Sequence, residues 1–409
     1  MLATLLIGMI TMAPPKIATP SYTSKLVFAP MEKHNHGSCL VETPKGNLLL
    51  CWYRGSGERT ADDVMVYGAR LKKGANQWTE PFVMAGVAGF PNTNPCLFFD
   101  DTKRLWLCWS TILDNHWESA LSRYKISTKY EQDDGSPVWQ SEEILHLKPG
   151  AEFHETYKAE FEKVWRPYIE SATPKEKAAL SEQLERKNKQ AQDKLSQRLG
   201  WMFRAHPTLL PNGRIILPLY SDAFDFSLMA YSDNRGESWQ VTRPLIGAGN
   251  VQPSIARRKD GTLLAYFRDN GLAPQRVQTA TSNDNGTTWS AVTDTDRVDS
   301  GSGVEVCVLQ SGRWLLVHND VEKGRHRLAL SVSEDEGATW RTGRYLENDP
   351  LSPDAGSYSY PSIIQAKNGT IHVSYTYRPS KQTAETVGKG SSIKHAAFNE
   401  SWVLQEGTP

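Results

Sequence analysis

Short apolar runs joined by tight polar turns recur along this chain. Each copy consists of an apolar strand, a turn that contains Gly, Asp or Asn, and a second apolar strand. These turn residues supply the positive φ that tight hairpins require, so each copy predicts a β-hairpin. The copies span residues 37–55, 94–111, 206–222, 252–269, 303–320 and 360–378. Six such hairpins predict an all-β protein, a six-bladed β-propeller over residues 25–405, whose blades pack against one another.

A second polar pattern follows three of these hairpins. Residues 282–289 and 333–340 both read S-x-D-x-G-x-x-W, and residues 232–239 differ only by Asn in place of Asp. We expect the short polar side chains to close a turn and cap its amides, while Trp packs between strands. The corresponding places in the other three repeats hold Trp78, Trp139 and Trp402. The pattern is therefore predicted to be a folding element far from the central axis, without a catalytic role.

Residues 150–200 interrupt the repeat, and their pattern predicts a helical hairpin between blades 2 and 3. Residues 173–176 read Thr-Pro-Lys-Glu, which combines an N-cap, a proline at the first helical position and a glutamate that closes a capping box. This helix is expected to end at Gly200. An earlier helix over residues 152–165 is expected to end around Pro167. The insertion is either a lid or wall at the site face, or a peripheral decoration or dimer contact.

The charge balance narrows the class of partner. Lys and Arg together number 46, and so do Asp and Glu, so no bulk field favours nucleic acid or an anionic membrane. Residues 2–13 form an apolar run that is too short to span a bilayer and is typical of a secretory signal. Residues 1–20 are therefore expected to be a signal peptide or N-terminal segment, and the protein to be secreted or periplasmic.

Four of the five cysteines fall in two pairs with the same spacing. Cys39 and Cys51, like Cys96 and Cys108, are twelve residues apart and flank a turn. Each pair is expected to lie opposite across a hairpin, with its redox state open. The chain has no CxxC spacing and no closed set of His, Cys and carboxylate ligands, so neither a metal nor another cofactor is expected.

Polar residues gather where the predicted blades meet the central channel. Innermost strands of a propeller begin at the mouth of the channel, so the first residues of equivalent strands converge. Those first residues are His36, Asn94, His206, Gln252, Glu305 and Tyr360. The ends of the second strands hold Arg54, Asp222, Arg268, Asp269, Asn319, Asp320 and Arg378. Unpaired buried charge is costly, so this set predicts a binding or catalytic site.

The hairpin repeat and the S-x-D-x-G-x-x-W boxes resemble the sialidase (neuraminidase) superfamily, in particular its bacterial BNR/Asp-box members. The resemblance covers roughly residues 30–130 and 200–405. It implies an exo-glycosidase that removes a terminal acidic sugar from a glycan, with three arginines on the sugar carboxylate. It also implies a Tyr nucleophile activated by Glu, and an Asp as acid and base.

The resemblance assigns roles to particular residues of this chain. Arg268 matches the second arginine of the family, and Arg325 matches the third. Tyr360 falls at the nucleophile, with Tyr358 as a rival, and Asp63 falls at the acid/base position. Planar guanidinium forks match a carboxylate, which is why arginine suits the binding role.

Two positions depart from the family pattern. His36 stands where the family has its first arginine, and Asn250 or Gln252 stands where it has the activating Glu; Glu305, one blade on, is a candidate to compensate. The remaining residues of the predicted substrate-binding set are Arg54, Arg378 and His206.

Other reactions fit the same set of residues. His beside Tyr and Arg also suits β-elimination from a uronate, as in a polysaccharide lyase, because His or Tyr removes the α proton while Arg neutralises the carboxylate. A glycosidase for another sugar such as rhamnose, and a non-catalytic glycan-binding propeller, are further alternatives. A glycan is the expected partner in each case, and the sequence does not indicate an oligomeric state.

Overall fold

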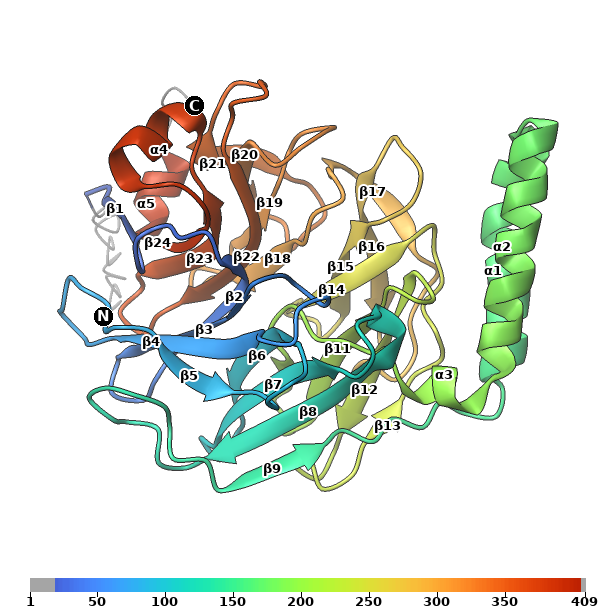
Figure 1. Cartoon of the computed structure of the whole chain (residues 1–409), viewed down its shortest axis with the longest axis horizontal. Helices are drawn as coiled ribbons and strands as arrows, with labels where there is room; N and C mark the ends of the chain where they lie inside the picture. The colour runs from blue at the N-terminus through green and yellow to red at the C-terminus, as the bar shows by residue number, and fades with distance from the viewer. Residues whose placement is uncertain (1–18, 406–409) are drawn as a thin grey trace, which may run out of the picture.

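The computed structural model describes residues 19–405 and contains six four-stranded antiparallel sheets arranged as blades around a central axis (Figure 1). The predicted six-bladed β-propeller is therefore confirmed. The expected signal segment falls almost entirely on residues 1–18, which lie outside the described part of the chain. No helix within residues 19–405 is long and apolar enough to cross a membrane.

The blades follow one another along the chain, each built from inner to outer strand. Blade 1 holds β2 (His34–Glu42), β3 (Leu48–Gly55), β4 (Met65–Leu71) and β5 (Phe82–Ala85). Blade 2 holds β6 (Asn92–Phe99), β7 (Leu105–Ile112), β8 (Ala120–Ser127) and β9 (Ser141–Ile144). Blade 3 holds β10 (Thr208–Leu209), β11 (Ile215–Ser221), β12 (Phe226–Ser232) and β13 (Gln240–Val241).

The second half of the ring repeats this order. Blade 4 holds β14 (Asn250–Arg257), β15 (Leu263–Asp269), β16 (Arg276–Ser282) and β17 (Thr293–Val298). Blade 5 holds β18 (Glu305–Val308), β19 (Trp314–His318), β20 (Arg327–Ser333) and β21 (Arg341–Asn348). Blade 6 holds β22 (Ser357–Gln365), β23 (Ile371–Arg378), β24 (Ser392–Phe398) and β1 (Tyr22–Leu26). Short helices are η1 (Trp117–Ser119), α4 (Lys381–Val387) and α5 (Glu400–Leu404).

Blade 6 joins the two ends of the described chain. β1 pairs antiparallel with β24, so that Tyr22 lies opposite Phe398. The first strand thus completes a sheet whose other strands come from the end of the sequence. This pairing closes the ring through backbone hydrogen bonds and covers an edge that would otherwise be open.

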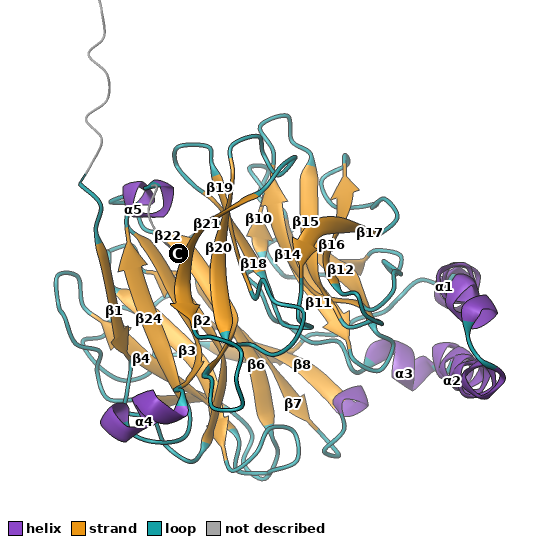
Figure 2. Cartoon of the chain, turned by 90° about the horizontal axis from the view of Figure 1, so that it is seen from above, coloured by secondary structure: helices purple, strands orange, loops and turns teal. Residues whose placement is uncertain are grey.

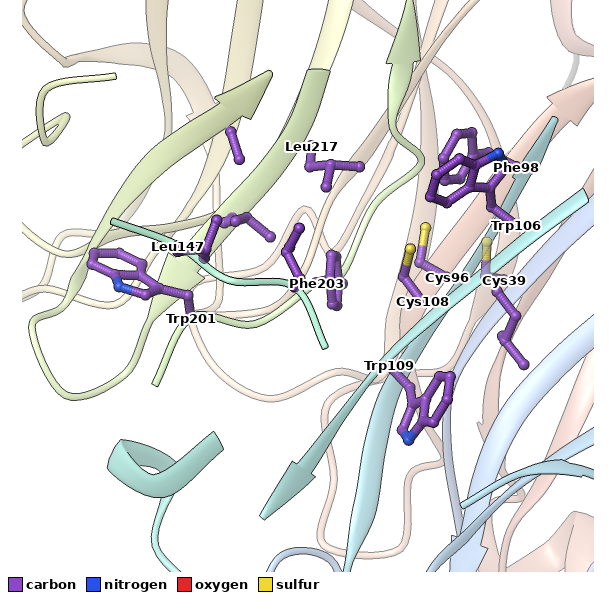
Figure 3. Packing of buried hydrophobic residues seen from close by; sticks show 14 of the residues in the cluster. Cys39, Cys96, Phe98, Trp106, Cys108, Trp109, Leu147, Trp201, Phe203 and Leu217 are labelled. Carbon is purple, nitrogen blue, oxygen red and sulfur yellow. The ribbon is translucent and has the colours of Figure 1, made fainter. Parts of the chain in front are cut away.

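The cysteine pairs lie where the spacing predicted. Cys39 faces Cys51 and Cys96 faces Cys108 across their hairpins. These four thiols are free and buried. Cys39, Cys96 and Cys108 belong to a hydrophobic cluster that also contains Trp106 (Figure 3).

The S-x-D-x-G-x-x-W boxes form turns between the outer strands, away from the axis, as predicted. In the box between β16 and β17, the Ser282 hydroxyl donates to Asp284 Oδ1 at 2.8 Å and accepts from the Gly286 amide at 2.9 Å. Asp284 also caps the Thr288 amide at 2.9 Å. The tryptophan of this box, Trp289, is half-buried, and its Nε1 donates to the Gly286 carbonyl at 3.1 Å.

The insertion is helical, as predicted, with α1 (Phe153–Ser171), α2 (Pro174–Gln192) and α3 (Lys194–Arg198). The predicted capping box is present: Glu176 Oε2 accepts from the Thr173 amide at 2.8 Å, and Thr173 Oγ1 accepts from the Glu176 amide at 3.5 Å. Figures 1 and 2 show the α1–α2 hairpin standing outside the ring rather than over the centre.

Two predicted helix ends are wrong. α1 continues through Pro167 to Ser171, whose hydroxyl bonds back to the Pro167 carbonyl at 3.0 Å. α2 stops at Gln192, before Gly200, because Asp193 is extended and its carboxylate caps the Ser196 amide at 2.7 Å to start α3. A local side-chain cap therefore ends α2 one short helix earlier than the glycine signal indicated.

Candidate active site

Four innermost strands bend in the same way at the mouth of the channel. β2, β6, β14 and β22 each shift register there. The residues in the bulges are Gly37, Asn94, Gln252 and Tyr360, with φ values of 62°, 51°, 55° and 53°. Left-handed backbone is costly for residues other than glycine, and a bulge redirects the side chain. The bulges therefore aim three side chains, from three blades, at one place.

That place is a pocket of about 300 Å³. It is lined by Tyr53, Glu58, Asn94, Trp117, Tyr220, Asp222, Gln252, Arg268, Asn270 and Tyr360. Blades 1, 2, 3, 4 and 6 all contribute, so radial symmetry brings residues from both halves of the sequence together. Of the residues that the sequence placed at the mouth of the channel, Asn94, Asp222, Gln252, Arg268 and Tyr360 line this pocket.

The Tyr360 hydroxyl accepts hydrogen bonds from two sides. Arg268 Nη1 donates to Tyr360 Oη at 2.9 Å, and Gln252 Nε2 lies 3.5 Å from the same oxygen. The Arg325 guanidinium carbon is 5.2 Å from the centre of the ring. Burial by itself would raise the pKa of Tyr360, but Arg268, Arg325 and the Gln252 amide together hold it below its ordinary value. The site is thus arranged to favour the phenolate.

A third arginine, Arg204, lies against Tyr360 and was not predicted. It comes from the loop that precedes β10, it is 3% exposed, and its guanidinium carbon is 5.0 Å from the ring centre. Its Nη2 donates to the Pro361 carbonyl at 2.6 Å, and Nη1 lies 3.4 Å from the Ser38 carbonyl. Arg204 therefore fixes the backbone beside the Tyr360 bulge. In the sequence, the signal that could have pointed to Arg204 is its position two residues before His206.

Asp222 provides an acidic group in the same pocket. Burial raises the pKa of Asp222 to about 6; Asp225 and Glu58 add to the effect, and Arg268 opposes it. A carboxyl with this pKa holds a proton over part of the ordinary pH range, which is what a general acid needs. The sequence placed Asp222 at the mouth of the channel without assigning it a role.

Blade 1 contributes an aromatic and imidazole cluster. The His36 ring lies 4.2 Å from the Tyr360 ring and 5.2 Å from the His34 ring, between centroids. His36 precedes the bulge residue Gly37, so it is offset by one position from Asn94 and its equivalents. Burial, followed by the nearby His34 and Arg325, holds the pKa of His36 well below its ordinary value, so the imidazole is neutral at pH 7.

Glu305 and His206 lie together, but neither lines the Tyr360 pocket. Glu305 Oε1 is 2.7 Å from His206 Nδ1 and accepts from the His206 amide at 2.8 Å. Glu305 Oε2 accepts from the Ile363 amide at 2.9 Å. Both side chains line a separate cavity of about 390 Å³. The Glu305 carboxylate thus connects blades 3, 5 and 6, and the structure does not bring it to the pocket as a substitute for the missing activating Glu.

Asp63 is held at the surface of blade 1 instead of in the pocket. Its carboxylate accepts from the Ser56 amide at 2.8 Å and the Ser56 hydroxyl at 2.7 Å, and it pairs with Lys33 at 3.3 Å. These bonds, above all those from Ser56, lower the pKa of Asp63. A carboxylate that stays ionised is poorly suited to donate a proton. Of the two carboxyl groups, Asp222 is therefore better suited to donate a proton.

Four further predicted residues lie outside the pocket. Arg54 Nε donates to Asn35 Oδ1 at 2.7 Å, and its guanidinium lies 4.4 Å from the Phe28 ring centre. The remaining three are Asn250, which bonds the Leu245 carbonyl and the Gly247 amide, Tyr358, which donates to Asp349 at 2.8 Å, and Arg378, which is exposed at the end of β23. None of the four lines the Tyr360 pocket.

Comparison with known proteins shows which family the chain resembles. Residues 46–160 and 183–373 match the BNR repeat-like domain family. The chain is 24% identical over 187 residues to a sialidase of Micromonospora viridifaciens and 32% identical over 183 residues to an anhydrosialidase of Macrobdella decora. These alignments cover 43% and 40% of this chain but only 26% and 23% of the relatives, about a quarter of their length.

A solved structure extends the likeness to the whole ring. The intramolecular trans-sialidase from Ruminococcus gnavus matches with a TM-score of 0.63 and 14% identity, covering 93% of this chain and 98% of that one. At this identity the likeness concerns the fold. The family match covers most of the chain, so this protein belongs to the BNR repeat-like domain family of the sialidase-like superfamily.

Proposed function

We propose that this protein is an exo-glycosidase that hydrolyses the bond to a terminal acidic sugar of a glycan. The observation that carries the proposal is a tyrosine hydroxyl bonded to Arg268, with a lowered pKa, in the same pocket as a carboxyl with a raised pKa. Pairs of groups with oppositely shifted pKa values are the mark of acid and nucleophile assignments. The two proteins that are similar in sequence, a sialidase and an anhydrosialidase, support the same class of reaction.

The reaction proceeds in two displacements. The Tyr360 phenolate attacks the anomeric carbon, the bond from that carbon to the leaving oxygen breaks, and Asp222 gives its proton to the leaving oxygen. The Asp222 carboxylate then takes a proton from water, the water oxygen bonds to the anomeric carbon, and Tyr360 leaves as phenolate. Sialidases differ from most glycosidases in using a tyrosine nucleophile, and the sequence match to that family underlies this assignment.

Gln252 gives this site its own means of activation. An activating Glu would accept the tyrosine proton, whereas the Gln252 amide donates to Tyr360 Oη. Arg268 donates to the same atom. The nucleophile is therefore prepared by two donors that stabilise the phenolate.

Arginines supply the binding site for the sugar carboxylate. Arg268 lines the pocket, and Arg325 stands over the Tyr360 ring beside it. Within residues 19–405, Arg268 Nε is buried without a hydrogen-bond partner. A bound carboxylate would meet that unused hydrogen-bonding capacity, which favours an anionic ligand over a neutral one.

A sialoside with a fluorescent leaving group tests the proposal. The wild type is expected to release the fluorophore, and Tyr360→Phe to lose at least about a hundredfold in kcat. Tyr358→Phe is the matched control, because Tyr358 lies two residues away and bonds Asp349 outside the pocket. Equal turnover by the two variants would remove Tyr360 from the mechanism. Binding without turnover by the wild type would instead indicate a glycan-binding propeller.

A second reaction, β-elimination from a uronate, is favoured by one observation. The centre of the neutral His36 ring is 4.2 Å from that of the Tyr360 ring, so an imidazole lies beside the phenolate-prone tyrosine. Tyr360 would take the proton α to the carboxylate, the bond at the β carbon would break, and Asp222 would protonate the leaving oxygen. Ultraviolet absorbance of an unsaturated uronate product, absent after hydrolysis, separates this reaction from the first.

A further inference from the structure

Lys187 of the helical insertion is an unusual lysine. It is 5% exposed, although lysine is almost never fully buried without a partner. Its ammonium group pairs with Asp225 Oδ2 and lies 5.9 Å from the centre of the Phe161 ring. The hydrolytic mechanism does not use Lys187, so its burial needs another explanation.

Asp225 lies in the loop between β11 and β12, three residues after Asp222. Its φ is +58°, a strained conformation for aspartate. The flanking Phe224 packs against α1, with its ring centre 5.7 Å from that of Phe153. The insertion therefore contacts this loop in two ways, through an apolar contact from α1 and an ion pair from α2.

Hydrogen bonds continue from Asp225 to the nucleophile. Asp225 Oδ1 accepts from Asn270 Nδ2 at 3.0 Å, and Asn270 Oδ1 accepts from Arg268 Nη2 at 2.9 Å. Arg268 Nη1 donates to Tyr360 Oη at 2.9 Å. An amide donates only through nitrogen and accepts only through oxygen, so Asp225 fixes the orientation in which Asn270 can hold Arg268.

We propose that the helical insertion is a working part of the active site, in which Lys187 is a positioning residue that neutralises Asp225 and so keeps Arg268 directed at Tyr360. The effect of Lys187 on catalysis rests on the proposed function, whereas its effect on the ionisation of Tyr360 does not.

Removal of Lys187 and removal of the Asp225 charge have opposite effects on the ionisation of Tyr360. Without Lys187, the Asp225 carboxylate adds an uncompensated negative charge near Arg268, which destabilises the phenolate of Tyr360. Without the Asp225 charge, Lys187 leaves an uncompensated positive charge, which stabilises it. The other charged and titratable groups around Tyr360 are unchanged in both variants; they are His36, Tyr53, Glu58, Arg204, Tyr220, Asp222, Arg268 and Arg325.

A ring-fluorinated tyrosine at position 360 of the full chain tests this directly. Its fluorine NMR signal reports the ionisation of that residue without any substrate. Lys187→Met is expected to raise the titration midpoint by roughly 0.3–1 pH unit, and Asp225→Asn to lower it. Lys187→Arg keeps the charge and is expected to restore the wild-type midpoint.

Lys189→Met is the matched control. Lys189 stands on the solvent side of the same helix, 73% exposed, and pairs with Glu185. It is expected to leave the midpoint unchanged. An unshifted midpoint in Lys187→Met, or shifts of the same sign in Lys187→Met and Asp225→Asn, overturns the proposal; if Lys187→Met does not fold, the sign of the Asp225→Asn shift decides.

The activity assay separates this inference from the proposed function. If the protein is a glycosidase, kcat/KM of Lys187→Met falls by about tenfold, because Arg268 is no longer held in place. If no variant or wild type turns over any glycan while the fluorine midpoints move as expected, the proposed function fails and the positioning role stands.

Discussion

Asp222→Asn is expected to make the protein less active and more stable at neutral pH. Folding moves the pKa of the Asp222 carboxyl from 3.8 to about 6, mainly because the carboxyl is buried. A group whose pKa is raised on folding contributes stability that is fully present below its unfolded pKa and is lost as the pH rises through the folded pKa. At pH 7 the ionised Asp222 therefore works against folding.

The size of both effects follows from this shift. A shift of about two units corresponds to about 3 kcal/mol, an upper bound because solvent partly reaches the side chain. With a pKa of about 6, roughly nine tenths of the carboxyls carry a proton at pH 5 and about a tenth at pH 7. If Asp222 is the proton donor, kcat falls on the alkaline side of about pH 6, and Asp222→Asn loses about a hundredfold.

Urea unfolding and turnover, each measured from pH 4.5 to 8, check the two effects on the same samples. Asp63→Asn is the control. Hydrogen bonds from Ser56 lower the pKa of Asp63, so its carboxylate stabilises the fold above its unfolded pKa, and its removal is expected to lower stability. An Asp222→Asn variant with wild-type turnover, or an Asp63→Asn variant that loses the alkaline limb, would refute the assignment of the proton donor.

Three other predictions concern the pocket and the blades. Arg268→Lys keeps the charge but not the two directed bonds to Tyr360 and Asn270, so kcat/KM is expected to drop about a hundredfold with an unchanged circular dichroism spectrum. Full activity would contradict a role for these bonds. Gln252→Glu replaces a donor to Tyr360 with an acceptor and is expected to shift the Tyr360-dependent limb of the rate profile to higher pH, whereas an unmoved limb would count against activation by donors. Trp340→Ala should lower the free energy of unfolding by about 3 kcal/mol in urea, and Trp289→Ala by less, because Trp340 is buried and Trp289 is only half-buried; equal losses would refute this explanation.

The architecture was predictable because its signals are local. A tight turn between two apolar runs, or a serine and aspartate that close their own turn at Ser282 and Asp284, needs no distant partner to take shape. The same holds for the capping box at Thr173 and the pairing of Cys39 with Cys51. Periodicity then places one such unit in each blade, and radial symmetry follows from the repeat.

The composition of the pocket was only partly predictable, because side-chain direction depends on bulges and loops. The sequence marked Tyr360, Arg268 and Gln252, which the bulged strands and the end of β15 bring together. It also marked Arg54 and Glu305, whose side chains bond to other blades or strands. Equivalent strand positions do not guarantee a shared pocket, since one residue of offset turns a side chain to the other face.

The sequence by itself determined the six blades, the outer turns, the start of the α2 helix and the tyrosine–arginine pair on which the proposed chemistry depends. Only the tertiary structure brought Arg204 to Tyr360, set Asp222 apart from Asp63 as the proton-holding carboxyl, and linked Lys187 to the site through Asp225. The physical reason is that local turns and caps are encoded within a few residues, whereas burial and long-range charge exist only once distant segments have packed.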